Sequence, residues 1–151
     1  MIFIDTNIFL YAAGKDHPLR APCQIFLQHV ITGKIAAVTS SEVVQELLYV
    51  LTRRGLRTEA MTLANQVLQL FPELLPVTRE DMDATCEILQ AMPAVSVRDA
   101  VHIGTMRNHG LERIISADHH FDSIPGIKRV DPATWKPLIA ADDSPLVDGS
   151  N

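Results

Sequence analysis

A strand that begins at the first residue and ends in a carboxylate is the feature that most constrains this chain. Residues 1–4 (MIFI) are an uninterrupted apolar run of β-favouring side chains, typical of a strand buried on both faces of a sheet. Asp5 follows directly. In open α/β sheets ligands bind at the carboxyl ends of the strands, and a half-desolvated carboxylate there needs a cation, hydrogen bonds or a proton. Asp5 is therefore either a ligand-binding group or the cap of the next turn.

The rest of the chain alternates predicted helices with predicted strands. Further strands are predicted at residues 35–39, 113–116 and 127–130, with a weak edge strand at 74–77. Helices are predicted at residues 8–13, 21–32, 40–54, 58–71, 78–92 and 97–109, and a turn or short helix at 119–123. This alternation indicates an α/β fold of three layers, with a central, mostly parallel sheet of four or five strands flanked by helices.

Three helix starts carry recognisable capping signals. Asn7 is expected to cap the short helix 8–13. Thr39 and Glu42 fit a capping box at the start of the helix 40–54. Thr78 is expected to cap the helix 78–92.

Length and composition indicate one ordered globular domain. The 151 residues are 47% hydrophobic and 21% charged, which suits a single core and excludes a disordered chain. We expect one domain over residues 1–137 and a disordered acidic tail over 138–151. No apolar run approaches the roughly 20 residues of a membrane span, and no signal peptide is recognisable. Cys23 and Cys86 are isolated, so both are expected to be buried thiols in a reducing, cytoplasmic location.

The net charge of −5 argues against a protein that grips nucleic acid through bulk positive charge. A nucleic-acid substrate stays possible, because divalent cations bound to clustered acids can neutralise a site locally. Arg53, Arg54 and Arg57 form a small basic cluster at a helix end, which could bind RNA phosphates or simply favour the helix C-terminus. Arg98 could hold a phosphate or pair with a neighbouring acid.

Four acids stand out because each lies at an element boundary or on a mostly apolar helix. They are Asp5, Glu46, Asp99 and Asp118. Two follow predicted strands and two lie on helices that could pack beside those strand ends. Taken singly, each acid has an ordinary explanation as a cap, a turn residue or a solvated side chain. Their shared context predicts that all four converge on one crevice.

Clustered carboxylates of this kind indicate a metal site. Like charges cannot share a site while ionised unless cations lie between them, and Mg²⁺ or Mn²⁺ with oxygen ligands meets that need. Such a site suits hydrolysis of a phosphodiester by a metal-activated water. His102 is expected to pack or to support the acids, and His119, His120 and Asp122 are expected to be solvated turn residues.

Four short segments resemble the acidic motifs of PIN-domain ribonucleases, and among these the VapC-type toxins of toxin–antitoxin pairs. They are residues 4–7 (IDTN), 44–47 (VQEL), 98–102 (RDAVH) and 116–121 (SADHHF), and the likeness extends over roughly residues 1–135.

The resemblance implies a PIN fold and Mg²⁺- or Mn²⁺-dependent cleavage of RNA. It implies Asp5, Asp99 and Asp118 as metal ligands, with Glu46 as a ligand or a water-orienting base. Thr6, Asn7 and Ser116 match polar positions that support the acids, Ser116 replacing a frequent Thr. It further implies homodimers and a small cognate antitoxin protein.

Three other functions compete with a toxin. One is a housekeeping RNA-processing nuclease of the same fold, and another is a non-catalytic interaction module whose acids bind a basic peptide. An aspartyl-phosphate phosphatase also begins with a strand that ends in Asp, but it usually carries a second acid two residues later, where this chain has Asn7.

Overall fold

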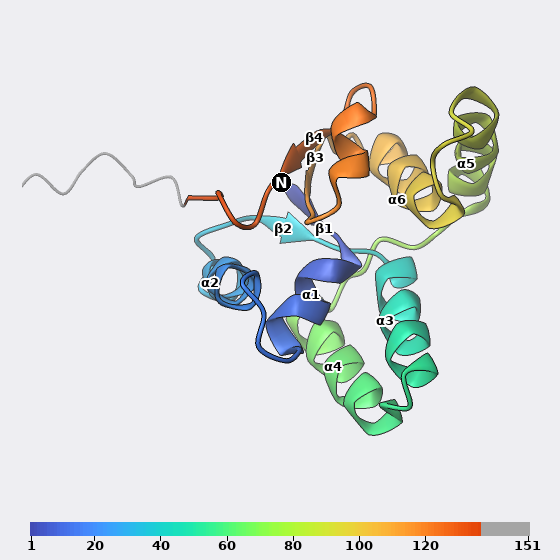
Figure 1. Ribbon diagram of the computed structural model, residues 1–151. Helices are drawn as coiled ribbons and strands as arrows, with labels where there is room; N and C mark the ends of the chain where they lie inside the picture. Colours follow the sequence, from blue (N-terminus) through green and yellow to red (C-terminus); the bar gives the residue numbers. More distant parts are fainter. Residues whose placement is uncertain (137–151) are drawn as a thin grey trace, which may run out of the picture.

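A parallel sheet of four strands organises the computed structural model, which describes residues 1–136. The strands are β1 (Ile2–Ile4), β2 (Ala37–Val38), β3 (Arg113–Ile115) and β4 (Lys128–Val130), in the order β2-β1-β3-β4 (Figure 1). Every pair is parallel, so the carboxyl ends of the strands meet at one edge. The predicted α/β class with a central parallel sheet is confirmed.

The first strand is central and wholly buried, as its apolar sequence predicts. Phe3 pairs with Val38 of β2 on one side and with Ile114 of β3 on the other. All three residues of β1 are buried because helices cover both faces of the sheet. The first residue beyond β1 is Asp5, which therefore lies in the middle of the sheet's carboxyl edge.

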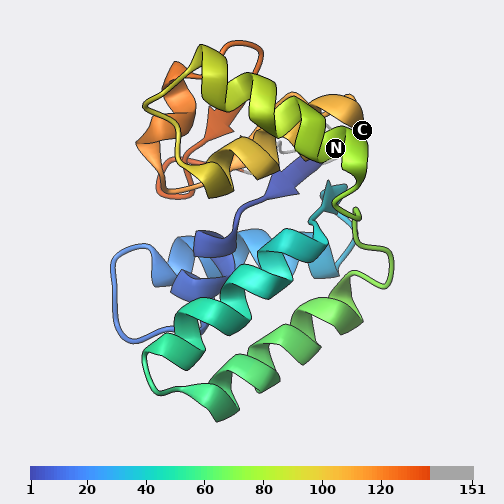
Figure 2. The same ribbon diagram turned by 90° about the vertical axis from the view of Figure 1, so that its right-hand side faces the viewer.

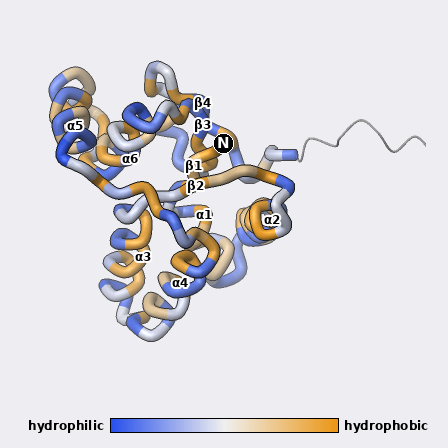
Figure 3. The backbone as a smooth tube through the Cα atoms, turned by 180° about the vertical axis from the view of Figure 1, so that it is seen from behind, coloured by the Kyte–Doolittle hydropathy of each residue, from blue (hydrophilic) through white to orange (hydrophobic). Residues whose placement is uncertain are grey.

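Within residues 1–136, six α-helices and one 3₁₀-helix surround the sheet. They are α1 (Thr6–Ala13), α2 (Arg20–Ile31), α3 (Ser41–Arg53), α4 (Arg57–Leu70), α5 (Arg79–Ala91), α6 (Val97–Asn108) and η1 (His119–Ser123). Figure 2 shows α1–α4 on one side of β1 and α5 and α6 on the other, which makes the three predicted layers. The hydropathy colours alternate along α3 and α4 in Figure 3, as expected of helices with one buried face. None of the helices in this part of the chain has the length and apolar character to cross a membrane.

Two predicted caps are wrong. Asn7 lies inside α1, whose N-cap position is held by Asp5 without a side-chain capping bond. Ser40, not Thr39, caps α3, because the Thr39 hydroxyl donates to the Ile4 carbonyl and so ties the end of β2 to β1. The predicted box of Thr39 with Glu42 therefore does not form. A capping box forms instead at α5, between Thr78 and Asp81.

Other differences concern the edges of the fold. Residues 74–77 form no strand, and only a single bridge joins Leu75 to Ser40, since Pro76 cannot donate to a ladder. Cys23 is buried, and that burial raises its pKa to about 11, whereas Cys86 is exposed, contrary to the prediction. The predicted disordered tail, residues 138–151, lies outside the described residues.

A glycine sets how closely α6 approaches α5. A Cβ added at Gly104 would lie 2.7 Å from the Asp81 carbonyl oxygen and 3.0 Å from Thr85 Oγ1, atoms of the neighbouring helix. This close contact fixes the position of α6, the helix that carries Arg98, Asp99 and His102.

We predict that Gly104→Ala destabilises the protein, although alanine normally favours a helix by about 1 kcal/mol. The clash with backbone atoms of α5 should cost about 1–3 kcal/mol in the free energy of unfolding, measured by urea denaturation. Asn65→Ala, at an exposed position of α4, is the control and should be neutral or slightly stabilising. Equal effects of the two substitutions would contradict the close contact.

Candidate active site

Asp5 is buried at the carboxyl edge of the sheet and is held by two polar side chains. Asp5 as a whole residue is only 6% exposed. Oδ2 accepts hydrogen bonds from Ser116 Oγ, at 2.5 Å, and from Asn7 Nδ2. Ser116 follows β3, the strand beside β1, so parallel pairing brings it to Asp5. The second oxygen, Oδ1, is turned toward the side chain of His102.

Asn7 and Ser116 also join the segments that follow β1 and β3. Asn7 Nδ2 donates to Ser116 Oγ at 2.9 Å, and Asn7 Oδ1 accepts from the main-chain N–H of Ala117 at 3.1 Å. Ser116 Oγ accepts in turn from the N–H of Asp118 at 2.9 Å. These bonds explain why Asn7 is no helix cap: its amide is engaged across the sheet edge.

Glu46 projects from α3 toward the same edge. Its Oε2 accepts from Thr6 Oγ1 at 2.6 Å, and its Oε1 lies 2.9 Å from Arg98 Nη1 of α6. The carboxylate is thus oriented from two sides, by a hydroxyl and by a guanidinium. Thr6 is buried, whereas the Arg98 side chain is 43% exposed, so one wall of the site reaches solvent.

For His102 the sequence left two roles open, packing or support of the acids, and the structure places it beside two of the acids. It lies one turn after Asp99 on α6 and its side chain is 1% exposed. Nε2 is 3.5 Å from Glu46 Oε2 and 3.9 Å from Asp5 Oδ1. Neither ring nitrogen has a hydrogen bond within the described residues. The i, i+3 spacing from Asp99 was the only sequence signal, and it fits packing equally well.

Of the four predicted acids, two come together directly. Donor atoms of Asp5, Glu46 and His102 all lie within 4.8 Å of one another, and within residues 1–136 this is the one such group of three or more metal-binding side chains. Asp99 and Asp118 are not members of that group. Asp99 Oδ2 accepts from Ser96 Oγ at 2.7 Å in the first turn of α6. Asp118 Oδ1 accepts from the N–H of His120 at 2.9 Å and caps η1.

Burial and charge together set the ionisation of this group. Burial raises the pKa of Asp5 to about 6, even though the charge of His102 and the hydrogen bond from Ser116 act to lower it. Burial also acts to raise the pKa of Glu46, but His102, Thr6 and Arg98 outweigh it and the pKa is lowered. For His102, burial acts to lower the pKa, while the carboxylates of Glu46, Asp5 and Asp99 raise it overall.

Arg129 of β4 holds the backbone behind the site, and the sequence had not singled it out. Its side chain is 7% exposed, and Nη1 donates to the Ser116 carbonyl at 2.9 Å. Nε and Nη2 bind both oxygens of Asp122, at 2.8 and 3.0 Å. Asp122 is an exposed residue of the turn η1, as expected, and it also pairs with this buried arginine.

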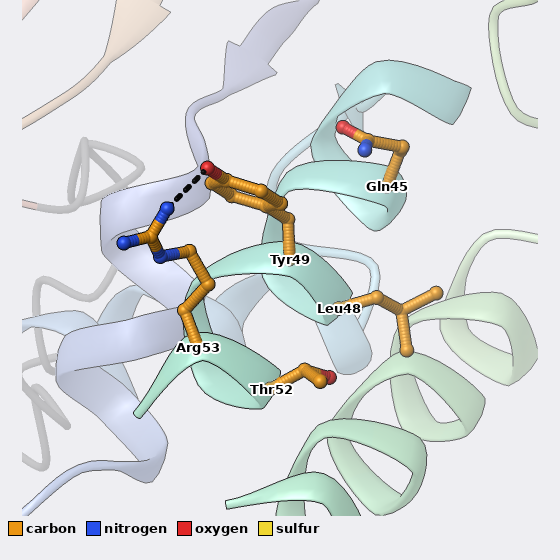
Figure 4. Close-up of a pocket in the computed structure, with 5 residues that line it drawn as sticks. All are labelled: Gln45, Leu48, Tyr49, Thr52 and Arg53. Carbon is orange, nitrogen blue, oxygen red and sulfur yellow. Dashed lines mark hydrogen bonds between the residues drawn. The ribbon is translucent and has the colours of Figure 1, made fainter. Parts of the chain in front are cut away.

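The predicted basic residues divide between two surfaces. The Arg98 guanidinium lies over the ring of Tyr49, 4.9 Å from its centroid, and Arg53 Nη1 donates to the Tyr49 hydroxyl at 3.1 Å (Figure 4). Tyr49 and Arg53 also line a shallow hollow of about 350 Å³ on α3. Arg54 instead lines a separate cleft of about 950 Å³, between α1, α3 and α4.

The parallel sheet with a carboxylate site at its carboxyl edge defines the class of protein. The family model of the PIN domain matches residues 2–127, so the chain belongs to the PIN-domain family. This agrees with the family that the four sequence motifs resemble.

Two ribonucleases of Mycobacterium tuberculosis are similar to this chain in sequence. Ribonuclease VapC13 of Mycobacterium tuberculosis is 36% identical over 132 residues, 86% of this chain and 99% of that protein. Ribonuclease VapC23 of the same species is 36% identical over 119 residues, 79% of this chain and 94% of that protein. A toxin–antitoxin complex from Klebsiella pneumoniae contains a similar fold, with a TM-score of 0.62 and 18% identity over 87% of this chain and 98% of that one.

We predict that Asp5→Asn stabilises the metal-free protein. The raised pKa of Asp5, about 6 against an unfolded value of about 3.8, means that the folded state disfavours the ionised carboxylate. Asparagine can still accept from Ser116 and Asn7 through its carbonyl oxygen. At pH 7–8 the variant should exceed the wild type by up to about 3 kcal/mol in the free energy of unfolding, measured in EDTA.

The pH dependence of that difference has a definite sign. Well below pH 3.8, the ordinary pKa of the group, Asp5 is protonated in both states, so the stability difference between variant and wild type should be at its smallest. It should grow between about pH 4 and pH 6, where the unfolded state ionises first, and stay constant above. Asp16→Asn, in an exposed loop, is the control and should show no such rise. A difference that shrinks as the pH rises would contradict the raised pKa.

Proposed function

We propose that this protein is a metal-dependent endoribonuclease that hydrolyses RNA phosphodiester bonds, the VapC-type toxin of a type II toxin–antitoxin pair. The observation that carries this proposal is the meeting of Asp5 and Glu46, each held by hydrogen bonds, at the carboxyl edge of a PIN-domain sheet. Support comes also from the ribonucleases VapC13 and VapC23, whose sequences this chain matches over most of its length.

The residues present fit a divalent cation. Two carboxylates and an imidazole offer donor atoms within 4.8 Å of one another, and the ring nitrogens of His102 have no hydrogen-bond partner in the part of the chain that the structure describes. Like-charged carboxylates at this spacing need a cation between them. We propose Asp5 as a ligand of Mg²⁺ or Mn²⁺, with Glu46 beside it. Asp99 and Asp118 lie outside this group of donors, and we propose them as further ligands because the family resemblance implies them. A bound ion would supply a water of lowered pKa and would polarise the phosphoryl oxygen.

Side chains of the protein orient the two carboxylates, and one of these carboxylates accepts a proton. Ser116 and Asn7 bind Oδ2 of Asp5, which leaves Oδ1 directed into the site. Thr6 and Arg98 fix the plane of Glu46, so its carboxylate can accept the proton of the attacking water. The water oxygen bonds to phosphorus, the P–O bond to the leaving ribose oxygen breaks, and that oxygen takes up a proton from solvent, to which Glu46 then releases its own.

RNA is proposed to approach along the exposed side of α3. Arg98 contacts both Glu46 and the Tyr49 ring, so a positive surface formed by Arg53 and Arg98 adjoins the acidic site directly. Although the protein has a net charge of −5, this surface gives it a local positive site for phosphates. Arg54, in the separate cleft, is proposed as a more distant phosphate contact.

The proposed partners follow from the proposed class. A toxin of this kind is neutralised by a small antitoxin, and a basic side chain of that antitoxin inserted among the carboxylates would compete with the metal. The similar fold within a toxin–antitoxin complex supports this partner. We propose a homodimer that acts in the cytoplasm, where its RNA substrate is found.

The test of the nuclease is cleavage of a mixed RNA pool by the purified protein with Mg²⁺, Mn²⁺ or EDTA. Fragments should appear with metal and not with EDTA, and Asp99→Asn should lower the rate at least about 100-fold, as loss of one charge-stabilising group does. Asp83→Asn, an exposed acid paired with Arg79 on α5, is the control and should cleave normally. Cleavage in EDTA, or an unimpaired Asp99→Asn protein, would contradict the proposal.

Two alternatives have distinct outcomes in the same experiment and in cells. Metal binding without cleavage of any RNA would favour the interaction module. Cleavage by a protein whose expression leaves growth unchanged would favour the housekeeping nuclease.

We predict that Arg53→Gln weakens RNA binding by removing a phosphate contact. In the Asp99→Asn background with Mg²⁺, affinity for a single-stranded oligonucleotide should fall and the slope of log K against log salt should decrease by about 0.7. Anisotropy titrations at several salt concentrations measure both. Arg79→Gln removes the same charge from α5 and is the matched control. Equal slopes for wild type and Arg53→Gln would place the RNA elsewhere.

A further inference from the structure

Within residues 1–136, the buried histidine of the site lacks the hydrogen-bond partners that its ring nitrogens normally need. His102 is 1% exposed, and both Nδ1 and Nε2 lack a hydrogen bond within residues 1–136. Buried polar nitrogens are ordinarily paired, because an unpaired one loses its hydration without compensation. The Phe3 ring lies on one side of the imidazole, with centroids 5.6 Å apart, and the Nε2 edge faces Asp5 and Glu46.

One explanation is that His102 is an imidazolium that neutralises the two carboxylates. A cation in that role is favoured by the carboxylates, which raise the pKa of His102, and it should donate a short Nε2–H bond to one of them. Glu46 Oε2 nevertheless lies 3.5 Å away, beyond the roughly 2.7–2.9 Å of such charged hydrogen bonds. Arg98 already supplies a positive charge to Glu46 at 2.9 Å. The imidazolium would also leave a second N–H, at Nδ1, buried without an acceptor.

The other explanation is that an ion belongs between these atoms. Ligand atoms about 2.1 Å from a metal and separated by 90–110° at the ion lie roughly 3.0–3.5 Å apart. Nε2 lies 3.5 Å from one carboxylate oxygen and 3.9 Å from another, close to that spacing and too far for strong hydrogen bonds. The three donors come from the residue after β1, from α3 and from α6, so the arrangement depends on the fold as a whole.

We propose that His102 Nε2 is a metal ligand, so that the site of this protein binds its ion through a mixed nitrogen and oxygen donor set. This inference concerns the metal of the proposed nuclease and rests on the proposed function for the use of that metal. The assignment of the ligand itself does not depend on RNA cleavage. Imidazole nitrogen suits first-row transition ions, whereas Mg²⁺ prefers oxygen. The site therefore selects Mn²⁺ over Mg²⁺ more strongly than carboxylates alone would.

The test is pulsed electron paramagnetic resonance of the protein loaded with Mn²⁺, without RNA. A directly bound imidazole should give a ¹⁴N coupling to the Mn²⁺ electron spin, and His102→Gln should abolish it, since glutamine offers an amide oxygen of similar reach. By titration calorimetry the same variant should lose roughly 10- to 100-fold in Mn²⁺ affinity and less than about 3-fold in Mg²⁺ affinity.

His120→Gln is the matched control. His120 Nδ1 lies 2.8 Å from Asp118 Oδ1, so it is the other histidine that contacts a predicted ligand, and its side chain is exposed. The ¹⁴N coupling should survive in this variant. Its loss there, its absence from the wild type, or an unchanged Mn²⁺ to Mg²⁺ affinity ratio in His102→Gln would overturn the proposal.

A second measurement covers the case in which His102→Gln does not fold. ¹⁵N-labelled histidine in the His120→Gln protein should replace the ¹⁴N coupling with a ¹⁵N coupling, and absence of that coupling overturns the assignment. Neither measurement involves RNA. A nitrogen-bound ion in a protein that cuts no RNA would defeat the proposed nuclease alone, while RNA cleavage without nitrogen coupling would defeat the ligand assignment alone.

Discussion

The burial of the Asp5 carboxylate at the end of the central strand is the constraint on which the rest of the structure depends. A charge in that position is favoured by His102 of α6, by Ser116, which β3 brings alongside, and by Asn7, which the first turn of α1 brings back to it. Ser116 and Asn7 also hold the backbone before Asp118. Arg129 supports this backbone from behind by binding the Ser116 carbonyl. The carboxyl edge of the sheet is thus one connected polar network.

Desolvation of Asp5 links stability with function. Burial raises its pKa to about 6, so the metal-free fold carries a carboxylate that it would hold more easily as a neutral group. A divalent cation reverses that preference, because it favours the ionised form. The cation proposed for this site would therefore stabilise it, as expected where function takes precedence over the stability of the metal-free fold.

The negative net charge of the protein conceals a local group of positive side chains beside the site. The chain is acidic overall, yet Arg98 lies between Glu46 and Tyr49, and Arg53 follows on the same exposed side of α3. A polyanion that approached along α3, as proposed for RNA, would meet these guanidinium groups beside the carboxylates. The tight contact of Gly104 with α5 helps to position Arg98 in this group, since it sets the place of α6, the helix that supplies Arg98 and His102.

The sequence by itself determined the parallel α/β class, the alternation of elements and the buried first strand, because hydrophobic periodicity and helix-end signals are local. It also pointed to Asp5 and Glu46 through their apolar surroundings. It mistook Asn7 and Thr39 for caps, since the partners that claim their side chains, Ser116 and Ile4, are far away in the chain. Only the tertiary structure decided that His102 faces two carboxylates, because the helix period allows a histidine to pack or to bind, and the neighbours alone distinguish the two.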